Sequence, residues 1–186
     1  MIRKRIGVLA GQIEENTQNL FLQGFLSSAF AEDYDVCIFS MYQKYQETPL
    51  REIGDTNIFQ LINYDRLDAI VVLLDTLQTP GIADYIEKKI HDSFHGPVLV
   101  IDKESKYFPN LMIDHCTPMQ KLVDHLIEVH HYKDIIFLNG RKEHIHSAQR
   151  LKGYMDSMKA HGLTVTDDMI YYGTYWYDSG DYMVDI

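Results

Sequence analysis

Short apolar runs alternate with longer stretches of helical period along almost the whole chain. A run of consecutive β-branched or aliphatic residues predicts a strand, and apolar residues that recur every three or four positions predict a helix. The predicted strands are 6–10, 34–40, 69–74, 98–101, 111–114, 135–138 and 169–172, and the predicted helices are 17–31, 56–64, 82–91, 117–129 and 147–160, with a further helical start after Gly180. This alternation is typical of βαβ units around a parallel sheet.

A polar connection interrupts the alternation once. Residues 102–110 contain Lys103, Glu104 and Pro109 and show no apolar period, after which the pattern starts again. We therefore expect an α/β fold with two Rossmann-like parallel-sheet lobes, 1–104 and 105–186, of which the second is incomplete because it stops after its third strand. Lobes of this kind place their binding loops at the carboxyl ends of the strands, where a cleft takes up small molecules.

Composition narrows the class of protein. With 46% hydrophobic and 24% charged residues the chain is expected to be globular, and its apolar runs are far shorter than the roughly 18 residues that span a bilayer. The beginning of the chain lacks the apolar segment of a signal peptide. A formal charge of −10 argues against a surface for nucleic acid. Cys37 and Cys116 do not form a CxxC pair, so we expect reduced thiols and a cytoplasmic protein.

Glycine motifs and carboxylates indicate whether the chain could bind or transfer phosphate. The segment after the first predicted strand fits neither GxGxxG nor GxxxxGK[ST], so no nucleotide cofactor is expected. Asp75 ends the third predicted strand, as the phosphoacceptor of a response-regulator receiver does. A receiver also needs carboxylates after its first strand to hold Mg²⁺, and residues 9–12 supply none. A receiver-like phosphoacceptor domain that uses Asp75 is therefore an alternative hypothesis for the function of the chain.

The histidines raise a metal hypothesis. His144 and His146 stand two residues apart, and on an extended segment such side chains point the same way. No HExxH motif occurs, and no nearby acid is spaced to complete a set of three ligands. A metal-dependent enzyme that uses these two residues is the second alternative. The main expectation is a chain with no metal, no cofactor and no catalytic residue.

Arg150 points to ligand binding instead. It opens a predicted helix, where its charge opposes the helix dipole unless an anionic or hydroxyl-rich group pairs with it. Its planar fork of donors suits a carboxylate or vicinal hydroxyls. The aromatic run 171–177 offers flat faces that can pack against a sugar or another cyclic ligand.

Six segments carry a family resemblance. They are Ile6-Gly-Val-Leu, Leu67-Asp-Ala-Ile-Val-Val, Gly96-Pro-Val-Leu-Val-Ile-Asp, the stretch from Asp114 through His125-Leu-Ile-Glu to Asn139-Gly140, Arg150-Leu-Lys-Gly-Tyr, and Tyr175 followed by Ser179-Gly180. In this order they resemble the LacI/GalR family of sensor domains, which have the periplasmic binding protein type I fold. The resemblance implies a bilobed module that closes around a small effector, often a sugar or purine, and reports to an output domain.

The resemblance also implies which residues contact the effector. The implied contacts are Thr17, Gln18, Asp114, His144, His146, Arg150 and Tyr175, with Trp176 as a neighbouring wall. It further implies a possible homodimer with no membrane partner. The family's DNA-binding helix-turn-helix would precede residue 1, so no direct nucleic acid contact is expected from this chain.

Residues 51–65 resemble sensor regions that stand in front of signalling domains such as GGDEF diguanylate cyclases. This resemblance predicts an output domain after residue 186, which would act in signal transduction or transcription regulation.

His130 departs from the family pattern. It stands where the family usually has a glycine that ends a helix in a left-handed turn, a conformation that is strained for histidine.

Overall fold

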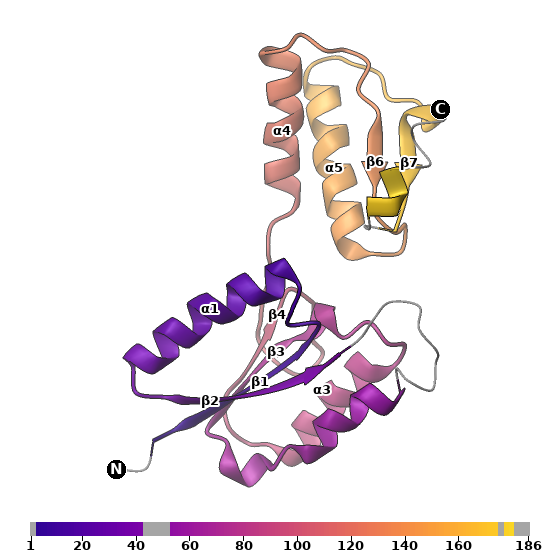
Figure 1. The fold of residues 1–186 in the computed structure, drawn as a ribbon. Helices are drawn as coiled ribbons and strands as arrows, with labels where there is room; N and C mark the ends of the chain where they lie inside the picture. Colours follow the sequence, from indigo (N-terminus) through magenta and orange to yellow (C-terminus); the bar gives the residue numbers. More distant parts are fainter. Residues whose placement is uncertain (1–2, 43–52, 175–176, 181–186) are drawn as a thin grey trace. The chain divides into compact units, whose positions relative to one another are not determined.

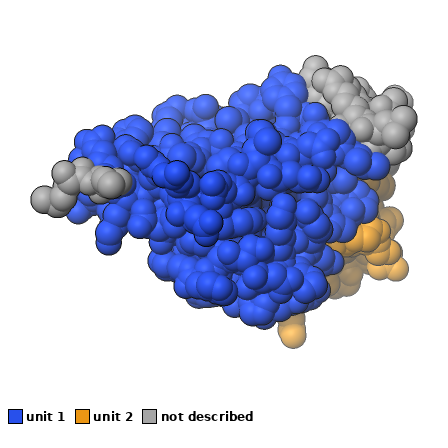
Figure 2. All heavy atoms as spheres, turned by 90° about the horizontal axis from the view of Figure 1, so that it is seen from below, with its two compact units in different colours: residues 1–112 blue, residues 113–186 orange. Residues whose placement is uncertain are grey.

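The computed structural model describes residues 3–42, 53–174 and 177–180, and it divides into two compact units. Unit 1 comprises residues 1–112 and unit 2 residues 113–186, coloured blue and orange in Figure 2. Each is an α/β unit built around a parallel sheet. Among the described residues, no helix combines the length and the apolar character needed to cross a membrane.

Unit 1 is built on a five-stranded sheet in the order β2-β1-β3-β4-β5, in which all neighbouring strands are parallel. Its strands and main helices are β1 (Arg5–Gly11), α1 (Asn16–Ala31), β2 (Asp35–Met41), β3 (Ala69–Leu73), α3 (Ile82–Ser93), β4 (Val98–Ile101) and β5 (Asn110–Leu111). The chain runs outward from β1 on one side and from β3 on the other. This confirms the doubly wound arrangement predicted from the alternating pattern.

Helices α1 and α3 cover opposite faces of this sheet (Figure 1). Val8 and Ala10 of β1 belong to the buried cluster that contains Leu22 of α1. Leu9, between them, belongs to the other cluster, together with Ile86 of α3. Successive side chains of a strand point to opposite faces, so a strand buried on both sides needs an unbroken apolar run. That is why the apolar runs of the sequence locate these strands well.

The helix predicted over 56–64 is not an α-helix. Two 3₁₀ turns occupy this region, η1 (Thr56–Leu61) and η2 (Tyr64–Arg66). Between them the side-chain oxygen of Asn63 accepts a hydrogen bond from the backbone N–H of Asp65 at 3.2 Å. A short polar side chain that binds the backbone in this way competes with helix hydrogen bonding, and the apolar period alone does not reveal that competition.

The strand predicted over 111–114 belongs to the first sheet rather than to a second lobe. Residues 110–111 pair with β4 in parallel register, and the backbone N–H of Asp102 donates to the carbonyl of Leu111 at 2.8 Å. Unit 1 therefore extends to Met112, whereas the sequence placed the boundary after residue 104. The polar connection is part of unit 1 because it returns the chain to the edge of the sheet.

Unit 2 packs two helices against a two-stranded parallel sheet (Figure 1). Its elements are α4 (Cys116–Glu128), β6 (Phe137–Asn139), α5 (Ile145–Ala160), the 3₁₀ turn η4 (Asp167–Met169), β7 (Ile170–Tyr172) and the 3₁₀ turn η5 (Tyr177–Gly180). Tyr154 is fully buried at the centre of the unit. Its ring stacks on Phe137 at 5.0 Å, and its hydroxyl donates to the carbonyl of Ile135 at 2.8 Å. The amphipathic ring thus fills the core while its polar end is satisfied.

The end of α4 corrects one expectation. The residue with left-handed backbone is His131, with φ of 60°, and not His130. The backbone N–H of His131 donates to the carbonyl of Ile127 at 3.0 Å, which satisfies one of the last carbonyls of the helix. A glycine at position 130 would therefore not sit at the position whose conformation favours glycine.

Candidate functional site

Gly153 brings the middle of α5 against the first turn of α4 in unit 2. A Cβ atom at this position would lie 2.3 Å from the carbonyl oxygen of Cys116 and 3.1 Å from the backbone nitrogen of Gln120. Only a residue without a side chain permits such an approach of two helices. Because Arg150 lies one turn before Gly153, the approach places its side chain beside the beginning of α4.

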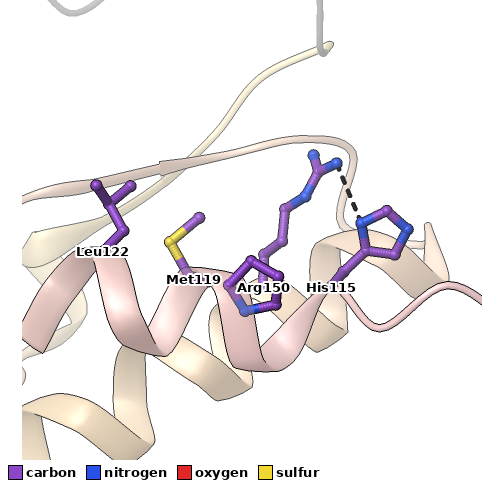
Figure 3. Close-up of a pocket in the computed structure, with 5 residues that line it drawn as sticks. His115, Met119, Leu122 and Arg150 are labelled. Carbon is purple, nitrogen blue, oxygen red and sulfur yellow. Dashed lines mark hydrogen bonds between the residues drawn. The ribbon is translucent and has the colours of Figure 1, made fainter. Parts of the chain in front are cut away.

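Arg150 and His115 form the polar part of a pocket. The Nη2 atom of Arg150 lies 3.5 Å from Nδ1 of His115, and Figure 3 shows the guanidinium turned toward that ring. The pocket has a volume of about 240 Å³ and is lined by His115, Pro118, Met119, Leu122 and Arg150. One wall is therefore apolar and comes from α4, while the guanidinium of Arg150 supplies N–H donors in a fixed plane. Such a combination suits a ligand with both C–H faces and hydroxyl or anionic groups.

Three imidazole rings follow one another at this end of unit 2, and we call His115, His146 and His144 the histidine row. The centroids of the His115 and His146 rings lie 4.1 Å apart, and those of His146 and His144 lie 4.7 Å apart at 66°. His146 is only 7% exposed. The sequence predicted His144 and His146 as neighbours, and the structure adds His115 from the beginning of α4.

His144 has a structural role within the histidine row. It is the N-cap residue of α5, and its Nδ1 atom accepts a hydrogen bond from the backbone N–H of His146 at 3.3 Å. This bond engages one of the two ring nitrogens that a metal could use. A metal-dependent enzyme built on His144 and His146 thus stays a prediction, and the capping contact is an ordinary structural reason for a histidine at this place.

Asp114 begins α4. Its Oδ1 atom accepts hydrogen bonds from the backbone N–H groups of Cys116 at 2.9 Å and Thr117 at 3.0 Å. Hydrogen bonding to the side chain and the backbone of Thr117 lowers the pKa of this exposed carboxyl group. The carboxylate therefore satisfies N–H groups that have no partner inside the helix. Its predicted contact with an effector remains untested.

The other predicted contacts lie elsewhere in the chain. Thr17 and Gln18 lie in the first turn of α1, in unit 1, where Thr17 is exposed and Gln18 half-buried. Tyr175 and Trp176 fall outside the described residues. The structure thus brings Arg150 together with the histidine row, and it leaves these four residues as predictions.

Asp75 lies in the 3₁₀ turn η3 (Leu74–Thr76), directly after β3. Its neighbour Thr76 holds this edge of the sheet, because its Oγ1 atom donates to the carbonyl of Leu73 at 2.6 Å and accepts from the N–H of Gly11 at 2.8 Å. These two hydrogen bonds of Thr76 connect the end of β3 to the end of β1. Phosphoacceptor chemistry at Asp75 stays a prediction.

His115 is a functional candidate that the sequence patterns do not predict. It stands 35 residues before Arg150, and no short spacing in the sequence relates the two. One signal was available, because His115 follows directly on Asp114, a residue predicted to contact the effector and placed before a helix. The pairing itself depends on the close approach of α4 and α5.

The chain is similar to known proteins over most of its length. The family model described as periplasmic binding proteins and sugar binding domain of LacI family matches residues 20–182. Among curated proteins, catabolite control protein A of Priestia megaterium is 32% identical over 99 residues, which is 50% of this chain and 30% of that protein.

Solved structures share the fold. The transcription regulator CcpA of Lactococcus lactis matches with a TM-score of 0.70 and 17% identity, over 99% of this chain and 64% of that one. A LacI family regulator, CcpA of Weissella paramesenteroides with bound sucrose, matches with a TM-score of 0.69 and 20% identity, over 97% of this chain and 63% of that one. The chain thus spans less than two thirds of these relatives. At such identities the matches confirm the predicted fold alone.

The relatives named above are regulators of transcription or catabolite control. They lend no support to the predicted link with diguanylate cyclases or to signal transduction. Part of the segment that suggested this link, residues 51–52, also lies outside the described residues.

Proposed function

This chain belongs to the family of periplasmic binding proteins and sugar-binding domains of the LacI family, and on that premise we propose that it senses a small, sugar- or nucleoside-like effector at the pocket beside Arg150. The observation that carries the proposal is the placement of the Arg150 guanidinium 3.5 Å from His115 at the edge of an apolar wall. The bound sucrose of the Weissella paramesenteroides regulator supports a carbohydrate as the ligand class.

The chemistry of the pocket fits such a ligand. The guanidinium donates hydrogen bonds in a fixed plane, which matches two neighbouring hydroxyl oxygens of a sugar ring. Met119 and Leu122 offer apolar surface to the C–H face of the same ring. The ring nitrogens of His115, the member of the histidine row that lines the pocket, can donate or accept according to tautomer, so this ring can add a further hydrogen bond to the ligand.

The remaining effector contacts are proposed from the family resemblance. They are Thr17, Gln18, Asp114, His144, His146, Tyr175 and Trp176. Among the residues of unit 2, Asp114 and His144 already bind backbone N–H groups at the starts of α4 and α5. A ligand that binds Asp114 or His144 would therefore contact side chains whose orientation is fixed by hydrogen bonds to the helix starts.

We further propose that effector binding regulates transcription through other parts of a longer or assembled protein, that the chain works in the cytoplasm, and that it is not an enzyme. The role in transcription is supported by two relatives, a catabolite control protein and a transcription regulator. The net charge of −10 supports a module that does not itself contact nucleic acid. A homodimer is part of the same proposal.

A ligand screen with a matched pair of variants tests the binding function. Thermal unfolding of the chain is followed with sucrose and other mono- and disaccharides, with nucleosides and with amino acids, and hits are measured by calorimetry. The test variant is Arg150→Ala. The control is Lys152→Ala, on the same helix, which removes an exposed ion pair with Asp156 and leaves the pocket intact.

We expect a sugar or nucleoside to stabilise the wild-type chain and the Lys152→Ala variant. Loss of hydrogen bonds from a charged donor costs about 1.5–3 kcal/mol, so the Arg150→Ala variant should bind roughly 10- to 150-fold more weakly. Equal affinity in both variants would remove Arg150 from the site. A chain that binds none of the compounds would contradict the proposed function.

A further inference from the structure

Two histidine rings face each other at the far end of α4. His125 lies in the last turn of the helix, and His130 lies in the turn that follows. Their Nε2 atoms are 3.2 Å apart, and the rings meet edge-on at 81° with centroids 5.0 Å apart. Both residues are exposed. We propose that this pair, the His125–His130 pair, chelates a divalent transition-metal ion of borderline softness, with Zn²⁺ as the reference ion.

The distance between the two nitrogens carries the proposal. Zn–N bonds of about 2.0–2.1 Å that meet at the tetrahedral angle place their two nitrogens about 3.3–3.4 Å apart. The observed 3.2 Å is within a few tenths of an ångström of that separation. A metal ion could therefore replace the shared proton between the rings with little movement of either side chain. Imidazole is a preferred ligand of zinc, copper and nickel.

The second histidine is held in place before any metal arrives. The ring of His130 stacks on Tyr132 with centroids 5.6 Å apart and an interplanar angle of 17°. The chain turns there through the left-handed His131, and the backbone N–H of Tyr132 donates to the carbonyl of Leu126 at 3.2 Å. Because the turn is closed by backbone hydrogen bonds, little conformational entropy is left to lose on chelation.

The electrostatic surroundings favour a cation. The carbonyl groups at the C-terminal end of a helix carry partial negative charge, and the whole chain has a formal charge of −10. Glu128 lies three residues after His125, which puts the two on the same side of the helix. Its Oε1 atom lies 3.7 Å from Nε2 of His161, so it adds negative charge on this side of the helix without being a ligand of the pair. Water would complete the coordination.

Zinc titration of the tag-free chain tests the proposal. ZnCl₂ is added at pH 7.5 to the wild type and to the variants His125→Gln and His130→Gln, and affinity and stoichiometry are measured by calorimetry. His91→Gln, an exposed histidine of unit 1 stacked on Tyr107, is the matched control. The same proteins are then unfolded thermally with and without the metal.

We expect one zinc ion to bind the wild type and the control, and to raise their unfolding temperature. Removal of either member of the pair abolishes chelation, so each variant should lose affinity by about 100-fold or more. Binding should also weaken at pH 5.5, because protons compete with the metal for imidazole nitrogen. Unchanged zinc affinity in His125→Gln and His130→Gln would overturn the proposal, because the metal would then bind elsewhere in the chain.

Discussion

Replacement of Gly153 by alanine tests how the pocket is built. The added methyl group would lie 2.3 Å from the carbonyl oxygen of Cys116 and 3.1 Å from Cβ of Met119. The first of these neighbours is backbone, which cannot turn away as a flexible side chain can. The two helices would have to separate, and Arg150 would move away from the start of α4.

Two effects of opposite sign set the size of the change. Forcing a methyl group into a close-packed contact costs about 1–3 kcal/mol. Alanine also stabilises a helix interior by about 0.5–1 kcal/mol relative to glycine. The close approach dominates because backbone has to yield, so we expect a net loss of about 1–2 kcal/mol in the free energy of unfolding.

Gly24 provides the matched control. It lies within α1, and an added Cβ would have no neighbour within 4 Å. Gly24→Ala should therefore stabilise the chain by about 0.4–1 kcal/mol. The assay is urea unfolding followed by far-ultraviolet circular dichroism, together with effector affinity. The reasoning is refuted if Gly153→Ala proves as stable as Gly24→Ala, since the helices would then have room for a side chain.

Two further predictions concern hydrogen bonds and pH. Tyr154→Phe removes the buried hydroxyl that donates to Ile135, so it should cost about 1–3 kcal/mol, measured by urea unfolding; a change within error would mean that water replaces the bond. Burial raises the pKa of Tyr154, so its contribution to stability should be complete below about pH 10 and be lost as the pH rises further. The pKa of Asp114 is lowered, chiefly by Thr117, so its contribution should be present at neutral pH and decline as the pH falls below about 4. Asp114→Asn should flatten that acid limb of the stability curve, and an unchanged limb would assign the acid sensitivity to other carboxyl groups.

Much of unit 1 could be predicted because its central strands β1 and β3 are buried on both faces. The runs at 6–10, 69–74 and 98–101 contain almost no polar residue, and each coincides with an observed strand within one or two residues. The apolar period failed over 56–64, where the side chain of Asn63 binds the backbone and divides the segment into two 3₁₀ turns. Periodicity reports which side is buried, and it is insensitive to such local competition.

The candidate site, like the fold, could be predicted only in part from the sequence. Arg150 could be singled out on the expectation that it opens a helix, where a cation is unfavourable without a partner. That expectation is wrong in detail, because α5 begins at Ile145 and Arg150 lies in its second turn. His115 could not be paired with it, since the two are 35 residues apart and meet only where α5 approaches α4. Family motifs identified the fold and the arginine, but no motif specified the neighbour of that arginine.

By itself, the sequence determined the α/β class, most element positions and the family, because these depend on short-range patterns of apolar, glycine and charged residues. The tertiary structure decided which sheet takes up 110–111, where the units divide, and which side chains lie around the pocket. Those features depend on the close approach of segments far apart in the chain. At Gly153 that approach is limited by the volume of a single methyl group, which no periodicity in the sequence records.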